Sequence, residues 1–141
     1  MIIFILATGF LITLSQSNLT PESIRYVKVA GQRVRVDLAL SAEAQAKGLG
    51  GRTGLTEGEG LLFVFDVPGK HRFWMEGMKF SIDIIWITES MQIVYIEKNA
   101  VPESYPETFG PDAYVKYVLE VPGGFSEKNN LKVGDPVVLS D

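Results

Sequence analysis

The chain of 141 residues contains no cysteine and only one histidine, His71. Without thiols it can form no disulfide, no thiolate nucleophile and no cysteine-based zinc site. One imidazole is too few for multi-histidine metal centres. His71 follows a Pro-Gly-Lys turn, so we expect it at the surface and outside any Ser-His-Asp triad. The composition thus removes most routes to covalent and metal-ion catalysis, and the sequence predicts no metal and no cofactor.

A soft-metal site is the one alternative that the composition leaves, because His71, Met75 and Met78 are close in the sequence. Thioethers and imidazole are ligands that copper accepts. However, a methionine at the start of a strand is more typical of core packing.

Clustered positive charge is also absent. The chain has 13 Lys and Arg residues against 17 Asp and Glu residues, which gives a net charge of −4 and a pI near 5.0. The basic residues are scattered along the sequence, whereas proteins that bind phosphate backbones gather them in patches. We therefore expect no nucleic-acid partner.

The first 21 residues lack charged side chains, and residues 2–14 form an apolar run. This run is shorter than the ~20 residues of a membrane span and is typical of a signal-peptide core. Because only the α-amino group provides positive charge before it, an uncleaved signal anchor is an alternative, and a buried first strand is a third. We predict residues 1–21 to be a signal peptide or signal anchor with a linker, and the protein to be extracytoplasmic, either secreted or anchored. The membrane would then be contacted only by this N-terminal segment.

Residues 22–141 are predicted to form a single domain of short strands separated by glycine and proline turns. We expect strands over residues 24–30, 34–40, 61–67, 80–87, 91–97 and 114–122, with a last one after Gly134. A short helix over 41–49 is indicated by Ser41 at the N-cap, alanines and Gly48 at the end. No βαβ alternation is visible. The pattern predicts a mainly β fold, namely a single compact β-sandwich or squat barrel of about seven to eight strands with one short helix.

The segment from Phe80 to Ile87 is apolar on both alternating faces, which predicts a central strand covered on both sides. Asp83 lies within it among isoleucines. A buried carboxylate is costly unless it is paired, so we expect Asp83 to bond to Arg52 or to backbone N–H groups of the glycine-rich loop 48–60. In the strand 114–122, we expect the side that carries Leu119 to face the core and the side that carries Glu120 to be its opposite.

The segments KGLGGRTGL, EGLLFVF, FWMEGMKFSIDIIWI, YVLEVPGG and LKVGD follow one another between Val34 and Val138. With them the chain resembles the family catalogued as domain of unknown function 192. The resemblance implies a compact, mainly β fold and, in many members, an N-terminal export segment, but it brings no established activity. The recurring positions of the family fall on five residues that become candidate ligand-binding residues: Arg52, Trp74, Met75, Asp83 and Glu120.

Three positions depart from the pattern of this family. Gly50 stands where the family usually has a methionine, Glu76-Gly77-Met78 stands in place of Lys-Asn-Thr, and Ser81 in place of proline. If the family function uses the Lys-Asn-Thr triplet, this member has lost or altered it.

Three function classes remain. Phe73, Trp74, Tyr105 and Phe109 would form an aromatic platform under the proline-rich loop 99–113, which favours a non-catalytic binding or accessory module for a small molecule, glycan or peptide. A carboxylate-based hydrolase is the enzyme alternative, with Asp83 paired with Glu120 or Glu76. The third is a structural envelope interaction domain. The sequence indicates no oligomeric state.

Overall fold

The computed structural model describes residues 18–141. The predicted signal peptide or signal anchor falls mostly on residues 1–17, which lie outside this part. Within residues 18–141, no helix combines the length and the apolar character needed to cross a membrane. The described helices are short: η1 (Pro21–Ser23), α1 (Ala42–Lys47), η2 (Pro102–Ser104) and α2 (Phe125–Lys128).

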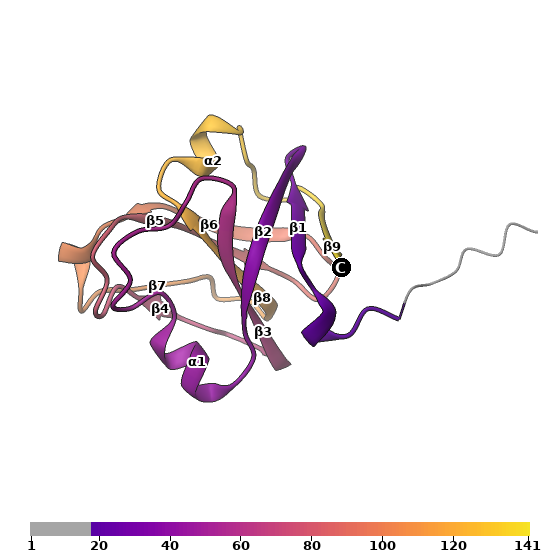
Figure 1. Ribbon diagram of the computed structural model, residues 1–141, viewed down its shortest axis with the longest axis horizontal. Helices are drawn as coiled ribbons and strands as arrows, with labels where there is room; N and C mark the ends of the chain where they lie inside the picture. Colours follow the sequence, from indigo (N-terminus) through magenta and orange to yellow (C-terminus); the bar gives the residue numbers. More distant parts are fainter. Residues whose placement is uncertain (1–17) are drawn as a thin grey trace, which may run out of the picture.

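Seven strands form one sheet in the order β6-β5-β8-β3-β2-β1-β9 (Figure 1). They are β1 (Tyr26–Val29), β2 (Gln32–Ala39), β3 (Glu59–Gly69), β5 (Ile82–Ile87), β6 (Ile93–Ala100), β8 (Val115–Pro122) and β9 (Val137–Ser140). A second, small sheet pairs β4 (Phe73–Trp74) with β7 (Thr108–Phe109). The mainly β fold predicted from the sequence is confirmed.

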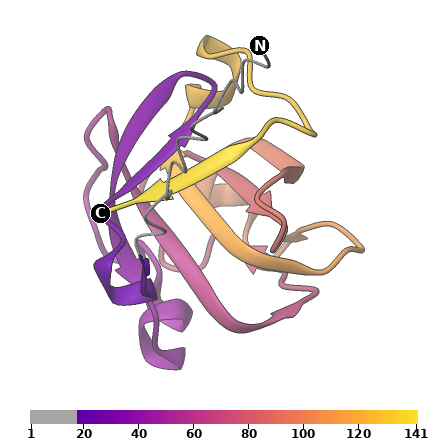
Figure 2. The same cartoon turned by 90° about the vertical axis from the view of Figure 1, so that its right-hand side faces the viewer.

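The large sheet is curled, so that its two edge strands approach each other. Figure 2 shows β9 beside β1, at the edge that curls round toward β6. Ile93 at the start of β6 donates its N–H to the Asp135 carbonyl at 3.0 Å and accepts from the Gly134 N–H at 2.8 Å. The Val137 N–H donates to the Met91 carbonyl at 2.9 Å. The sheet is therefore a half-barrel whose edges meet at one end.

One connection differs from the sequence-based expectation. The chain leaves β2, passes through α1 and the glycine-rich loop, and returns to pair with β2 as the parallel strand β3. Ser41 Oγ accepts the Ala44 N–H at 3.1 Å and begins the helix, which ends at Gly48 with φ of 51°. The expectation that the chain contains no βαβ unit was thus wrong for this pair of strands, because a single crossover leaves no repeating pattern in a sequence.

The sheet has apolar cores on both faces. The first lies inside the curl, where Ile85 and Leu119 pack with residues of β1, β2, β3 and β9. The second lies on the outer face, where Ile84 and Trp86 pack under α1 and the segment around β4. All six residues of β5 are buried, as the two-sided apolar pattern predicts.

The strand β8 is buried on both sides near its end, which corrects the expectation that only the side carrying Leu119 faces a core. Val118 is fully buried and Glu120 is 5% exposed. The outer face of β8 is covered by residues of α1 and β4. Period-two alternation gives the side on which a residue lies, but it does not show which distant segments cover that side.

Candidate ligand-binding site

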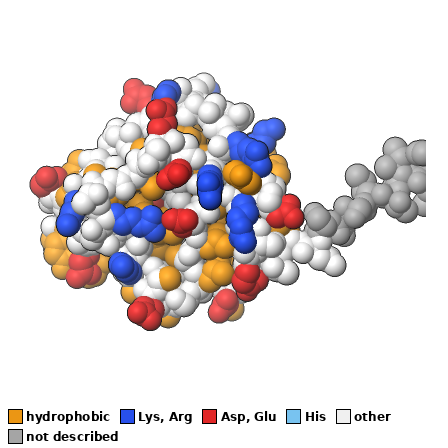
Figure 3. Space-filling view, viewed as in Figure 1, with side chains coloured by type: hydrophobic (Ala, Val, Ile, Leu, Met, Phe, Trp, Pro, Cys, Tyr) orange, Lys and Arg blue, Asp and Glu red, His pale blue; other side chains and the backbone are white. Residues whose placement is uncertain are grey.

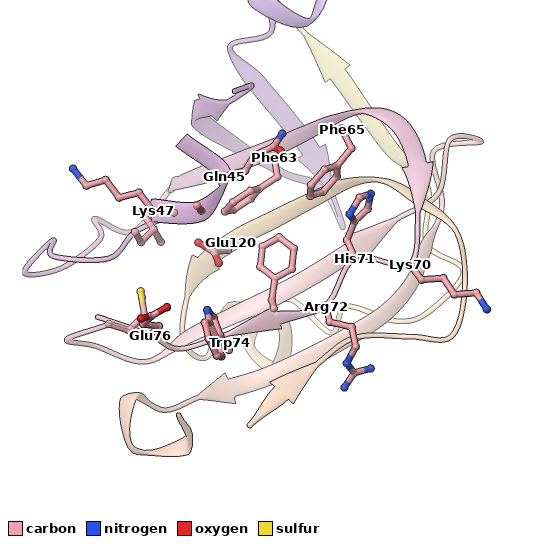
Figure 4. Close-up of a pocket in the computed structure, with 15 residues that line it drawn as sticks. Gln45, Lys47, Phe63, Phe65, Lys70, His71, Arg72, Trp74, Glu76 and Glu120 are labelled. Atoms are coloured by element: carbon pink, nitrogen blue, oxygen red, sulfur yellow. The ribbon is translucent and has the colours of Figure 1, made fainter. Parts of the chain in front are cut away.

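A cavity of about 340 Å³ lies on the outer face of the sheet, between α1 and the segment that follows β3 (Figure 4). It is lined by residues 45–49, by Phe63 and Phe65 of β3, by most of the segment 70–78 and by Glu120. Four separate stretches of the sequence thus meet here.

The helix α1 is fixed over the sheet by one polar side chain. Gln45 Nε2 donates to the Ala39 carbonyl at 3.1 Å and to the Val64 carbonyl at 3.0 Å, which ties the helix to β2 and β3. Gly48 then passes close to the cavity floor. A Cβ atom there would lie 3.3 Å from the Phe63 ring and 3.9 Å from Glu120 Oε2. The position requires glycine both for its positive φ and for this close approach.

Aromatic rings form the walls. Phe63 and Phe65 alternate along β3 and present their rings on the same face. Phe73 meets Phe63 edge to face, with 4.7 Å between ring centroids. The sequence reasoning missed Phe63 and Phe65, although their i, i+2 spacing in LLFVFDV was a signal that they share one face.

His71 is half-buried rather than at the surface, which corrects the sequence-based expectation. Its ring stacks on Phe65 with 3.5 Å between centroids, and Nε2 is buried with no hydrogen-bond partner among the described residues. Burial lowers the pKa of His71, and a backbone hydrogen bond with Val67 acts in the opposite sense. Both effects arise from the turn at Pro68 and Gly69, which folds the imidazole back onto the strand instead of into solvent.

Glu120 supplies the acid at the cavity floor. Its side chain points into the space between Gln45 and Lys47 on one side and Trp74 and Glu76 on the other (Figure 4). Oε2 is buried and has no hydrogen-bond partner in the described part of the chain. Burial raises the pKa of Glu120 to about 8, although the charge of Arg52 acts to lower it. With that pKa the group is mainly the neutral carboxylic acid at pH 7, which can donate a hydrogen bond as well as accept one.

The cationic side chains around the mouth are turned away from the cavity. Lys70 pairs with Asp112 at 2.6 Å. Arg72 donates to the Thr108 side chain at 3.0 Å, to the Thr108 carbonyl at 2.7 Å and to the Gly110 carbonyl at 2.9 Å. Figure 4 shows both heads pointing outward. The interior of the cavity thus contains little fixed charge.

Trp74 forms one edge of the mouth and is 46% exposed. Its indole lies against Tyr105, with 5.1 Å between centroids and 59° between ring planes. The pairing of Phe73 with Phe109 and of Trp74 with Thr108 brings the proline-rich loop to this edge. The four aromatic residues of the predicted platform are therefore neighbours, with Phe73 and Phe109 inside and Trp74 and Tyr105 outside.

The five candidate residues do not form a single cluster. Trp74 and Glu120 both line the cavity. Met75 is 1% exposed and belongs to the outer core. Arg52 lies at the surface, where it pairs with Asp37 at 3.3 Å, and it acts on Glu120 only through its charge. Asp83 lies elsewhere.

Asp83 is fully buried, as predicted, but its predicted partners were wrong. The carboxylate accepts hydrogen bonds from the backbone N–H groups of Asn99 at 2.9 Å, Gly124 at 3.1 Å and Ser126 at 2.7 Å. These donors belong to the end of β6 and the start of α2, not to the glycine-rich loop that carries Arg52. Backbone N–H groups were one of the two kinds of donor expected, but the sequence placed them in the wrong segment because backbone donors carry no side-chain signature.

Asp83 and Glu120 project from opposite faces of the sheet. In the antiparallel register of β5 with β8, Glu120 lies opposite Ile84, and Asp83 lies opposite Val121. Ile84 belongs to the outer core and Val121 to the inner one. The two carboxyl groups therefore cannot act on one substrate, which overturns the Asp83 and Glu120 pair considered for a hydrolase.

Two of the departures from the family pattern lie against each other. The Gly51 N–H donates to the Gly77 carbonyl at 3.0 Å. A Cβ atom on Gly50 would lie 2.9 Å from the Lys47 carbonyl oxygen and 3.6 Å from that of Glu76. The side chain missing at position 50 thus allows a close contact between the two loops beside the cavity.

Comparison with known proteins agrees with this architecture. The family model DUF192, described as "Uncharacterized ACR", matches residues 25–139. The chain belongs to the DUF192 family. A protein of unknown function from Novosphingobium aromaticivorans is 34% identical with a TM-score of 0.76, and the match covers 82% of this chain and 84% of that one. A candidate transcription regulator from Sinorhizobium meliloti is 26% identical with a TM-score of 0.74, covering 82% and 91%. No curated protein matches.

Proposed function

We propose that this DUF192 domain is a non-catalytic binding module that holds a small molecule in the cavity above Glu120. The observation that carries the proposal is the carboxylic acid of Glu120, which is nine-tenths buried, faces the cavity and has no partner in the described part of the chain. A buried polar group without a partner costs about 1–3 kcal/mol, and a ligand that bonds to it would recover much of that cost.

The size and lining of the cavity support the same conclusion. Ligand pockets commonly measure about 300–1,000 Å³ and combine aromatic walls with a few polar groups. The cavity of about 340 Å³ lies at the small end of this range. A second hollow of about 460 Å³ lies near Arg33 and Phe125, but none of the buried unpartnered side-chain atoms lines it. The cavity above Glu120 is therefore the better candidate.

Binding is favoured over hydrolysis because Glu120 is the one buried carboxyl group among the residues that line the cavity. Asp83 faces the other core, and Glu76 is exposed at the mouth. Glycosidases need two carboxyl groups that flank the scissile bond, one of which acts as base or nucleophile. An interaction domain without a small-molecule site is disfavoured because its acid would remain unpartnered.

We also propose that the domain acts outside the cytoplasm, with residues 1–21 as its export signal or anchor and as its only contact with the membrane. The uncharged apolar run in that segment supports this location. Nucleic acid is not among the proposed partners, because Lys and Arg alternate with Asp and Glu over the visible face (Figure 3) and the net charge is −4.

The test of binding is a fragment screen of the ¹⁵N-labelled protein by NMR, with small ring compounds as probes. Fragments that bind should shift the amide signals of residues 45–49 and the indole N–H of Trp74. Ala46→Trp, which fills the cavity from α1, should abolish these shifts. Ala42→Trp, on the same helix but outside the cavity, is the matched control and should keep them. Fragment shifts that survive in Ala46→Trp would refute the site.

The location is tested separately, by fractionation of cells that express the full-length chain. The protein should be found in the extracytoplasmic or membrane fraction. Recovery of the intact chain from the soluble cytoplasmic fraction would contradict export without affecting the binding site.

A further inference from the structure

The mouth of the cavity continues outward as an aromatic shelf, formed by Trp74 and Tyr105. Both rings are exposed, Trp74 by 46% and Tyr105 by 44%. They are in contact, with 5.1 Å between centroids. Apolar side chains that gather at the surface beside a cavity are typical of interaction sites. Because the ring planes differ by 59°, the shelf is twisted rather than flat.

The cavity alone is too small for a long ligand. At about 340 Å³ it has room for one or two rings against Phe63, Phe73 and Glu120. A ligand that also reached Tyr105 would have to leave the cavity past Trp74. Such a ligand would have one unit inside the cavity and one or more units outside it, on the shelf. A chain of linked rings has this arrangement.

The charges select against an ionic ligand. A cation would have to deprotonate Glu120, whose pKa is about 8. It would also approach a mouth where Lys47 and Arg72 outnumber Glu76, while Asp112 balances the charge of Lys70. An anion would find the heads of Lys70 and Arg72 already held by the neighbouring loop, and the head of Lys47 pointing away from the cavity (Figure 4). A neutral ligand meets neither obstacle.

The polarity selects against a purely apolar ligand. An alkyl chain would cover the aromatic walls but would leave Oε2 of Glu120 without a partner, at the desolvation cost of a buried polar group. A ring that carries hydroxyl groups satisfies both requirements, since its C–H face packs on aromatic carbon while its hydroxyl groups donate to and accept from a carboxylic acid.

From these four observations we infer that the ligand is a neutral oligosaccharide, with one sugar ring held against Glu120 in the cavity and the next rings stacked on Trp74 and Tyr105. This inference rests on the proposed binding function and names its ligand class. The terminal ring enters between α1 and Phe73, and the chain leaves across the shelf.

The test uses the full-length protein and neutral tetrasaccharides of glucose, N-acetylglucosamine, mannose, galactose and xylose, each paired with its monosaccharide. Binding is followed by the fluorescence of Trp74, because Trp86 is fully buried. At least one tetrasaccharide should saturate the signal and bind about tenfold or more tightly than its monosaccharide, since it gains aromatic stacking outside the cavity. Trp74→Phe should remove the fluorescence change and thereby assign it.

Single substitutions separate the two halves of the site. Tyr105→Ala should reduce the affinity of the tetrasaccharide toward that of the monosaccharide and leave the monosaccharide unchanged. Glu120→Leu should weaken both. Tyr114→Ala is the matched control, because Tyr114 is 66% exposed but lies outside the cavity lining, and it should change neither.

Two results would overturn the inference while keeping the cavity as a site. In the first, ring fragments bind in a manner blocked by Ala46→Trp, yet none of the five tetrasaccharides binds. In the second, benzylamine binds more tightly as the pH is raised, with an affinity that increases about tenfold for each pH unit up to pH 8. This dependence is the signature of a cation that displaces the proton of Glu120. If neither a ring fragment nor a saccharide binds in the cavity, the proposed function itself is refuted.

Discussion

Asp83 Oδ2 accepts a hydrogen bond of 2.7 Å from the backbone N–H of Ser126, across 43 positions of the sequence. Together with the bonds from Asn99 and Gly124, this contact joins the central strand β5 to the end of β6 and the start of α2. These three backbone N–H groups bond to the carboxyl group of Asp83 instead of to backbone carbonyl groups, and without it they would lack an acceptor.

Asp83→Ala should therefore lower the free energy of unfolding by about 3–5 kcal/mol, because three backbone donors lose their acceptor at once. Denaturant melts measure this loss. Asp37→Ala, which breaks the exposed pair with Arg52, is the matched control and should cost less than about 1 kcal/mol. Equal losses for the two variants would show that Asp83 contributes no more than a surface charge.

Glu120 should make the stability of the domain fall as the pH rises. Its pKa is raised from 4.5 to about 8 in the folded protein, so the folded state binds the proton more tightly than the unfolded state. The stabilisation is fully present below about pH 4.5, and about 1.4 kcal/mol is lost per pH unit until the pH passes 8. Glu120→Gln should remove this slope in denaturant melts between pH 5 and 9. A slope that persists in Glu120→Gln would assign it to other groups.

Gly48 should be among the least replaceable glycines, because it combines φ of 51° with a close approach to Phe63. Gly48→Ala should cost about 1–2 kcal/mol of unfolding free energy. Gly54→Ala is the control: its φ lies outside the positive region, and nothing lies within 4 Å of the added Cβ atom, so it should be neutral. Thermal denaturation of both variants gives the comparison, which fails if Gly54→Ala is as damaging as Gly48→Ala.

Arg72 should hold the proline-rich loop in place through its three hydrogen bonds to Thr108 and Gly110. Arg72→Lys should not restore them, because an ammonium group lacks the planar fork of donors. Hydrogen exchange of the amides in residues 102–110 should become faster in both Arg72→Ala and Arg72→Lys, and should remain unchanged in Arg35→Ala. Unchanged exchange in Arg72→Ala would show that the pairing of β4 with β7 alone fixes the loop.

The parts of the fold that follow from local pattern were predictable from the sequence. The apolar alternation of residues 80–87 predicted a strand buried on both faces, and Ser41 with Gly48 predicted the ends of α1. The burial of Asp83 followed from its apolar neighbours. Its partners did not, since any residue can offer a backbone N–H group.

The candidate site was less predictable because it depends on what covers the outer face of β8. Glu120 came from the family resemblance, while the alternation in the strand placed it on the side opposite the expected core. The covering segments, α1 and the residues after β3, are distant in the sequence. The position of His71 depended in the same way on how the turn after β3 folds back, which turn residues alone do not specify.

The most direct measurement is a ¹³C NMR titration of the Glu120 side-chain carboxyl group, free and with a saturating ligand from the fragment or saccharide screen. In the free protein the midpoint should lie near pH 8. With ligand bound it should move higher, because a hydrogen bond donated by the neutral acid favours the protonated form. A midpoint near 4.5, or one that a saturating ligand leaves unchanged, would contradict a role for Glu120 in binding.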